Sequence, residues 1–217
     1  VAGLLGSGRT ELIRVLFGAD TDYSGEMEVE GKKVHFRIPA DAIAKGIALC
    51  PEDRRTEGII PNLSVRENIT IVLLPVLSKW GIVSRKEQER ITEEFITRLG
   101  IKTADMEQAV KNLSGGNQQK VLLARWLCTH PKLIIMDEPF VGLDPKASHL
   151  LKELMHDLCQ AGGAIFFSTH VLEVAEKLCD QIAIIKKGKL IVSGNTQEVI
   201  GDDSLEEVFL ELEDDHA

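Results

Sequence analysis

Two hydrophobic patterns alternate along the chain. Residues 133–136, 164–167 and 182–185 form short, uninterrupted apolar runs, which are typical of strands buried on both faces of a parallel sheet. Between residues 84 and 99, apolar side chains recur every three or four positions instead, and this spacing predicts an amphipathic helix packed on a core. The two patterns together predict an α/β fold, in which residues 53–130 are mostly helical.

Polar residues mark where helices are expected to begin. Ser84 is followed three residues later by Glu87, which is the spacing of a capping box. Asp144 and Pro145 predict another helix start, with Asp144 as the N-cap and Pro145 in the first turn. Near the C-terminus, apolar positions between 205 and 212 predict a short helix that docks through one face.

A Ser-Gly-Gly turn precedes the predicted helix of residues 118–127. Ser114, Gly115 and Gly116 offer a hydroxyl and closely approachable backbone N–H groups at a helix N-terminus, where partial positive charge favours an anion. We interpret the turn as a phosphate-binding element. The alternative is a plain serine N-cap followed by flexible glycines.

Two adjacent acids end the apolar run at 133–136. Asp137 and Glu138 would be costly in a core without a cation. We therefore expect Asp137 to contact Mg²⁺, usually through water, and Glu138 to polarise a water that attacks a terminal phosphate. The alternative is an acidic exit from the strand without a metal.

A glycine-rich segment near the start fits the phosphate-loop pattern G-x-x-x-x-G-K-[ST] at every fixed position except one. The segment is Gly3-Leu4-Leu5-Gly6-Ser7-Gly8-Arg9-Thr10. Backbone N–H groups of residues 6–10 are expected to cradle a β-phosphate, and the Thr10 hydroxyl is expected to face Mg²⁺. A helix over 10–17 would add its dipole. The alternative is a glycine-rich turn without a ligand.

As a set, these motifs resemble the ATP-binding cassette (ABC) transporter ATPases over essentially the whole chain. Residues 114–116 are similar to the family's signature motif and 137–138 to its Walker B motif, while 142–144 resemble the D-loop and His170 the switch histidine. The resemblance implies a P-loop fold with a mostly parallel sheet and an inserted helical subdomain, which binds ATP and Mg²⁺.

The resemblance also implies roles for particular residues. Catalytic roles fall on Glu138 and His170, and metal contacts on Thr10, Glu52 and Asp137. The expected nucleotide contacts are Gly3, Leu4, Leu5, Gly6, Ser7, Gly8, Arg9, Thr10, Glu11, Ser114, Gly115, Gly116 and Asp144.

Two positions depart from the family pattern. Arg9 stands where the family has lysine, and the two cations are not interchangeable; Glu52 stands where the family has its Q-loop glutamine. Both departures resemble the second cassette of monosaccharide importers of the ribose, galactose and xylose type. They leave two alternatives: a cassette that hydrolyses ATP, or a degenerate cassette that only completes a partner's site.

The C-terminal third has a different character. His170, the segment 140–145 and the segment 186–190 resemble other cassette ATPases, including exporter-type ones. We therefore expect a composite of two lineages joined near residue 140, from engineering or from divergence. The predicted organisation is a nucleotide-binding core at 1–52 and 131–217 with a helical subdomain at 53–130.

Composition narrows the class of partner. The 217 residues carry a formal net charge of −9, which argues against a general nucleic-acid binder. Four scattered cysteines predict reduced core thiols, and no apolar run is long enough to span a bilayer.

The resemblance implies a second ATP-binding cassette and transmembrane permease subunits as partners, at the cytoplasmic face of the plasma membrane. Because Val1-Ala2-Gly3 runs directly into the loop motif, we expect most of the preceding strand, and the family's adenine-stacking aromatic, to be missing.

Overall fold

The computed structural model describes residues 7–214 and, within that range, all side chains except those of 54, 55, 213 and 214. Gly3, Leu4, Leu5 and Gly6 of the predicted phosphate loop lie outside the described residues. The chain divides into two compact units. Unit 1 comprises residues 1–41, 137–139 and 166–217, and unit 2 comprises residues 42–136 and 140–165. The predicted boundaries at 52/53 and 130/131 stay a prediction.

A three-stranded sheet has the order β3-β6-β7. Strands β3 (Ile47–Cys50) and β6 (Leu133–Asp137) are parallel, in a register that places Cys50 opposite Met136. Every residue of β6 after its first is buried, and the third strand is β7 (Ala164–Ser168). The prediction that residues 133–136 form a buried strand of a parallel sheet is therefore confirmed. A strand that is covered on both faces has no polar face, which is why its sequence is an uninterrupted apolar run.

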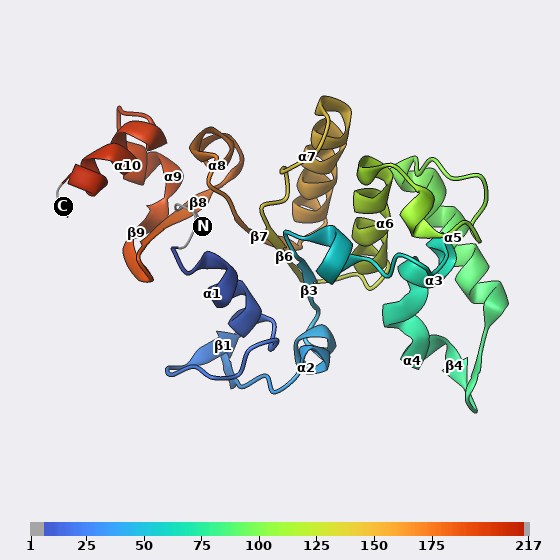
Figure 1. Cartoon of the computed structure of the whole chain (residues 1–217). Coiled ribbons are helices and arrows are strands. Elements are labelled where there is room, and N and C mark those ends of the chain that lie inside the picture. Colours follow the sequence, from blue (N-terminus) through green and yellow to red (C-terminus); the bar gives the residue numbers. More distant parts are fainter. Residues whose placement is uncertain (1–6, 215–217) are drawn as a thin grey trace. The chain divides into compact units, whose positions relative to one another are not determined.

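Three helices of unit 2 pack against one another (Figure 1) and are called its helical part below: α3 (Val65–Thr70), α5 (Arg85–Leu99) and α6 (Gly115–Leu127). A buried arginine of α6, Arg125, joins α6 to α3 by donating from Nε to the carbonyl oxygen of Asn68 at 2.7 Å and from Nη2 to its Oδ1 at 2.8 Å. Nη1 donates to the Gly58 carbonyl oxygen, so each nitrogen of the buried guanidinium has an acceptor.

The remaining elements assigned to unit 2 are short, apart from one long helix. They are η1 (Arg54–Gly58), η2 (Ile71–Leu73), α4 (Leu74–Leu77), β4 (Ser78–Lys79), β5 (Ile82–Val83), η3 (Val110–Asn112) and α7 (Pro145–Gln160). Helix α2 (Pro39–Ala44) spans the boundary between the units. The hairpin of β4 and β5 interrupts residues 53–130, which the sequence predicted to be mostly helical.

The predicted capping box at Ser84 is wrong. Ser84 is the N-cap of α5, but its side chain makes no capping bond, and Glu87 instead accepts from Arg90 Nε at 3.0 Å on the exposed face of the helix. A capping box forms at α3, where Ser64 Oγ accepts from the Glu67 N–H and Glu67 accepts from the Ser64 N–H. The same Ser-x-x-Glu spacing therefore has two outcomes, and the surroundings decide between them.

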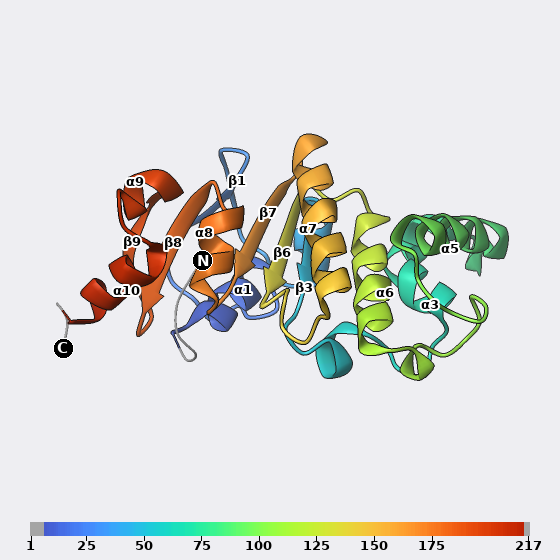
Figure 2. The same cartoon turned by 90° about the horizontal axis from the view of Figure 1, so that it is seen from above.

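Unit 1 contains its own small core. Strands β8 (Gln181–Lys186) and β9 (Lys189–Asn195) form an antiparallel hairpin, and in Figure 2 α9 and α10 lie beside it. Ile184 is 1% exposed and Leu205 0%, and both belong to this core. The predicted helix near the C-terminus is thus confirmed as α10. The other elements are α1 (Arg9–Leu16), β1 (Met27–Val29), β2 (Lys32–Val34), α8 (Leu172–Leu178), α9 (Thr196–Ile200) and α10 (Leu205–Asp214).

Candidate functional site

The two acids at the end of β6 belong to unit 1 and are both buried, with Asp137 4% and Glu138 5% exposed. Glu138 has a φ of 44°, a left-handed conformation that costs a non-glycine residue roughly 1–2 kcal/mol. Its backbone N–H donates to the Ser168 carbonyl oxygen at 3.1 Å. Backbone strain of this kind concentrates at functional sites, where the surrounding structure holds it in place.

The Glu138 carboxylate has two basic partners. Arg9 Nη1 donates to Oε1 at 2.8 Å, and both side chains are almost fully buried. His170 Nδ1 lies 2.8 Å from the same oxygen. Because an ionised carboxylate only accepts hydrogen bonds, Nδ1 carries the proton in that contact. Both contacts fall on Oε1, so neither occupies Oε2.

The Asp137 carboxylate has hydroxyl partners. Thr10 Oγ1 donates to Oδ2 at 2.8 Å, and Ser168 Oγ donates to Oδ1. Asp137 therefore lies against the first turn of α1, next to the end of the loop motif. Carboxylate and hydroxyl oxygens are ligands suited to a hard divalent cation such as Mg²⁺.

The described end of the loop runs directly into α1. Gly8 is its N-cap, with a φ of 93° that glycine adopts without strain. The Ser7 carbonyl accepts from the N–H of Gly188 in the β8–β9 turn at 2.8 Å. Ser7 Oγ is buried and has no hydrogen-bond partner among the described residues. An unpartnered hydroxyl at a helix N-terminus fits a bound phosphate, which would supply the missing partner.

The Ser-Gly-Gly turn lies in unit 2, at the start of α6. Ser114 is the N-cap by backbone geometry, but its side chain does not cap the helix. Its Oγ instead accepts from Asn117 Nδ2 at 2.9 Å, and Asn117 Oδ1 accepts from the Lys102 N–H at 2.8 Å. Ser114 is exposed, and its hydroxyl does not accept a hydrogen bond from the first turn of the helix, as the side chain of a plain serine N-cap would.

Gly116 and Asp144 lie close together in the same unit. A Cβ added to Gly116 would be 3.6 Å from Asp144 Oδ2, while Oδ1 of Asp144 caps α7 by accepting from the N–H groups of Lys146 and Ala147. The N-cap prediction for Asp144 is confirmed. Burial, assisted by Lys102, lowers the pKa of Lys120 on the second turn of α6, and Asp144 opposes this shift.

The predicted site residues thus form two clusters. Cluster 1 contains Ser7, Gly8, Arg9, Thr10, Asp137, Glu138 and His170. Cluster 2 contains Ser114, Gly115, Gly116 and Asp144. Glu11 is exposed in the first turn of α1, and Glu52 is exposed just after β3 in unit 2.

Sequence reasoning missed three contributors to these clusters: Ser168, Gly188 and Asn117. Ser168 ends a predicted strand beside His170, and a hydroxyl at that strand end was a usable signal. Gly188 lies in the segment 186–190, for which the sequence indicated a resemblance to other cassette ATPases but no contact with the site. Asn117 follows the Ser-Gly-Gly turn directly, but nothing in the sequence indicated which group its amide would hold.

The cysteines do not form a further site. No disulfide joins any of the four within the part of the chain that is described. Burial raises the pKa of both Cys50 and Cys128 to about 12, so both are neutral thiols near neutral pH. Cys50 and Cys128 are thus core thiols as predicted, whereas Cys159 is exposed and Cys179 is half-buried, so the prediction of core positions is wrong for Cys159.

Solved structures share this fold. An ATP-binding subunit of an ABC transporter is 27% identical, with a TM-score of 0.77 over 97% of this chain and 85% of the other. An ATP-binding cassette solved in its ADP conformation is 23% identical, with a TM-score of 0.76 over 96% and 85%, and it supports the fold alone. The predicted P-loop α/β class is confirmed. Among residues 7–214, no helix is both long and apolar enough to cross a membrane.

Curated relatives are similar over most of this chain. The fructose import ATP-binding protein FruK of Bifidobacterium longum is 45% identical over 185 residues, which is 85% of this chain and 36% of the relative. The galactofuranose transporter ATP-binding protein YtfR of Escherichia coli K12 is 45% identical over 191 residues, 88% of this chain and 38% of the relative. A ribose import ATP-binding protein, RbsA of Shouchella clausii, is 39% identical over the same shares. The chain therefore spans little more than a third of these relatives' length.

The family model for ABC transporters matches residues 1–141, which include the phosphate loop, the Ser-Gly-Gly turn and the Asp-Glu pair. The predicted join of two lineages near residue 140 stays a prediction. With the motifs, the fold and the relatives in agreement, this chain belongs to the ATP-binding cassettes of the ABC transporter family.

Proposed function

We propose that this chain is an ATP-hydrolysing subunit of an importer, which couples ATP binding and hydrolysis to the uptake of a monosaccharide. The observation that carries the proposal is the buried Glu138, held between Arg9 and His170 beside the Asp137–Thr10 pair. The names of the relatives, which concern import of fructose, galactofuranose and ribose, support a sugar as the transported solute.

The start of α1 binds the phosphates in this proposal. N–H groups of residues 7–10 and the helix dipole face the anion, and the Ser7 hydroxyl gains the partner it lacks. Arg9 supplies positive charge at the end of the loop. Its guanidinium has several donors, and the bond from Nη1 to Glu138 uses one of them, so we assign the other N–H groups to a phosphate oxygen.

In this proposal Thr10 and Asp137 would hold Mg²⁺. When bound, the ion neutralises phosphate charge that develops in the reaction. Ser168 fixes one Asp137 oxygen, so the carboxylate keeps one orientation, with Oδ2 towards Thr10.

Glu138 acts as the base that orients and polarises the attacking water. The contacts from Arg9 and His170 both fall on Oε1, so Oε2 is the oxygen we assign to the water. His170 holds the carboxylate in position through Nδ1, and its other ring nitrogen is then available to a terminal phosphate oxygen.

Cluster 2 serves a partner cassette. The exposed Ser114 hydroxyl and the N–H groups of Gly115 and Gly116 would contact the phosphates of a nucleotide held by the partner, next to Asp144. A second cassette and transmembrane permease subunits are therefore the proposed partners, at the cytoplasmic face of the membrane.

A second candidate function is a cassette that binds ATP without hydrolysing it. The Arg9–Glu138 pair favours it, because the ion pair engages a carboxylate oxygen of the residue that would have to act on water. Cluster 2 would then be the functional part of the chain, and hydrolysis would take place in the partner cassette.

Hydrolysis of Mg²⁺-ATP by the purified chain separates the two candidates, with nucleotide affinity measured in parallel using a fluorescent ATP analogue. We expect turnover that Glu138→Gln abolishes while affinity is retained. Glu198→Gln, at an exposed position of α9, is the matched control and keeps full turnover. Binding without turnover in the unsubstituted chain refutes hydrolysis and supports the second candidate, whereas absence of binding refutes both.

A further inference from the structure

The β4–β5 hairpin has an unusual residue at its turn. Trp80 and Gly81 join the two strands with φ values of 55° and 79°. Two-residue hairpin loops with both central residues at positive φ favour asparagine, aspartate or glycine at the first position. Tryptophan is bulky and pays a steric cost there, so local turn chemistry does not account for it.

The side chain of Trp80 contributes nothing to a core. It is 101% exposed, whereas the chain's other tryptophan, Trp126, is 7% exposed. Val76 before the hairpin and Ile82 after the turn are 77% and 76% exposed. Three large apolar side chains within seven residues therefore face solvent, and exposed apolar groups gathered in this way mark interaction sites.

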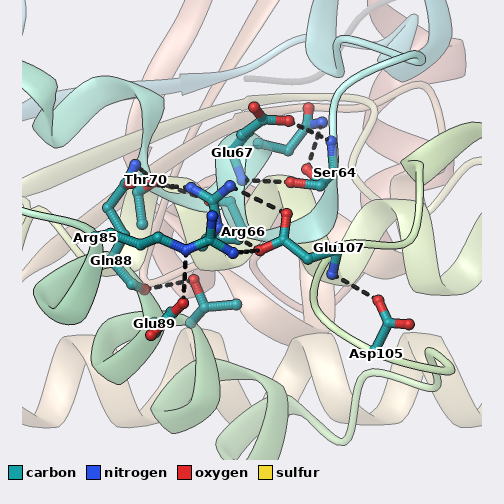
Figure 3. A network of polar contacts seen from close by, with 11 residues as sticks. Ser64, Arg66, Glu67, Thr70, Arg85, Gln88, Glu89, Asp105 and Glu107 are labelled. Carbon is teal, nitrogen blue, oxygen red and sulfur yellow. Dashed lines mark hydrogen bonds and ion pairs between the residues drawn. The ribbon is translucent and has the colours of Figure 1, made fainter. Parts of the chain in front are cut away.

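The base of the hairpin is fixed. The Ser84 N–H donates to the Leu77 carbonyl oxygen at 3.0 Å. Arg85, the first residue of α5, donates to Glu89 at 2.8 Å and to Glu107 at 3.3 Å, within the polar network of Figure 3. These contacts hold the base of the hairpin in place, so that little conformational entropy is lost when the tip binds.

The charge around the tip differs from that of the whole chain. Residues 76–86 contain Lys79, Arg85 and Lys86 and no aspartate or glutamate; because Arg85 is paired with Glu89 and Glu107, Lys79 and Lys86 supply the local positive charge. The complete chain carries −9. Local positive charge around an apolar tip is complementary to an anionic surface.

A lipid surface fits this tip better than a protein face does. Tryptophan is enriched where apolar and aqueous phases meet, because its ring is amphipathic, and basic residues near it are attracted to anionic headgroups. Each strand of the hairpin has only two residues, so its tip offers much less surface than the roughly 800 Å² that each partner buries in a standard protein interface. A tip of this size suits shallow insertion into a lipid layer.

We propose that the β4–β5 hairpin inserts Trp80, with Val76 and Ile82, into the interfacial layer of an anionic lipid membrane, and that Lys79 and Lys86 contact the headgroups. This interaction goes beyond the proposed transport function and needs no nucleotide. It would give the chain a membrane contact of its own, independent of any permease.

The test uses the full chain with vesicles of phosphatidylcholine alone or mixed with phosphatidylglycerol. We expect sedimentation with the anionic vesicles, together with a blue shift of tryptophan emission and quenching by brominated acyl chains. Because Trp126 is buried, these optical changes report on Trp80. Trp80→Ser is expected to lower the partition coefficient about tenfold, which corresponds to about 1.4 kcal/mol, whereas Leu210→Ser, at a 54% exposed position of α10, leaves it unchanged.

A second pair of variants tests the charge. Lys79→Glu/Lys86→Glu is expected to abolish the preference for anionic vesicles, and the matched control Lys45→Glu/Lys189→Glu, which changes the net charge equally at exposed positions, is expected to retain it. An unshifted emission with vesicles overturns the proposal and leaves a protein as the occupant of the tip. Equal losses in Trp80→Ser and Leu210→Ser, or in the two double variants, overturn it as well.

Discussion

Arg66 provides a sharp test of what holds the helical part of unit 2 together. It is 8% exposed on α3 and makes a forked ion pair with Glu107, from Nε to Oε1 at 2.7 Å and from Nη2 to Oε2 at 3.1 Å. Its Nη1 donates to Gln88 Oε1 on α5 at 2.9 Å. Gln88 in turn donates to Thr70 Oγ1 at 2.8 Å, and Thr70 donates to the Arg66 carbonyl oxygen at 2.8 Å. Figure 3 shows this closed circuit.

Arg66→Lys keeps the charge and removes the fork. A lysine ammonium reaches at most one of the three acceptors, because it is a compact group on a flexible stem. Leaving the buried Gln88 carbonyl without a donor costs about 1–3 kcal/mol. Glu107 is half exposed, with 44% of its side chain accessible, so its share is at most about 1 kcal/mol. The free energy of unfolding should therefore fall by about 1–4 kcal/mol, with a central value of about 2 kcal/mol.

Urea unfolding followed by Trp126 fluorescence measures this loss in unit 2, provided that the exposed Trp80 is first replaced by phenylalanine. With a slope of about 2 kcal/mol per molar urea, the midpoint should fall by about 1 M. Arg85→Lys is the control, since Arg85 contacts the same Glu107 from a side chain that is 67% exposed. Its midpoint should move by less than about 0.3 M. Equal shifts in the two variants would refute the argument that the buried Gln88 contact supplies most of the stabilisation.

Three further predictions concern the two clusters and the network. Gly116→Ala should fold normally, because its Cβ meets only ordinary contact distances, yet it should reduce ATP turnover in dimers at least tenfold by obstructing the phosphate contact; unchanged turnover would count against the role of cluster 2. Arg9→Met should lower the free energy of unfolding by about 3 kcal/mol, because the buried Glu138 carboxylate loses its guanidinium partner and retains the partly exposed His170. Adding Glu138→Gln should recover most of that loss, as measured by hydrogen exchange of β8. The Arg66 hydrogen bond lowers the pKa of Glu107 below its ordinary 4.5, so this carboxylate's stabilisation is complete above that value and is lost as the pH falls through the lower folded pKa. The stability gap between the unsubstituted chain and Glu107→Gln should thus be constant well above pH 4.5 and narrow as the pH falls below that value; a gap that does not change with pH would contradict the ionic account.

Part of the site could be predicted from local sequence. An uninterrupted apolar run ending in Asp137 and Glu138 had to be a buried strand with acids at its end, and the structure places it so. The pairing of Glu138 with Arg9 could not be predicted, because the two residues are 129 positions apart and only the assembled fold brings them together. The φ of 44° at Glu138 had no sequence signal either, since that conformation is held by tertiary contacts against the residue's own preference.

The hairpin and the capping box show a different limit. Strands of two residues are too short to show an alternation of apolar and polar side chains. The sequence therefore carried no signal for β4 and β5, and the segment that contains them was predicted as mostly helical. Ser64 and Ser84 are both followed by glutamate three residues later. Only Ser64 is buried, at 5% exposed, where an unmet hydrogen bond would be costly. On the exposed face of α5, Glu87 pairs with Arg90 instead.

The two clusters also differ in how far along the chain their contacts reach, and this bears on which function is more easily lost. Glu138 and Asp137 depend on bonds to Arg9 and Thr10 that span 129 and 127 positions. The bonds that hold Ser114 through Asn117 span 3 and 15 positions. Contacts of long sequence separation form only when most of the chain is ordered, whereas local ones survive partial unfolding. Destabilising substitutions in unit 1 should therefore remove hydrolysis before they remove the surface offered to a partner cassette. A degenerate cassette can arise in this way without any change in cluster 2.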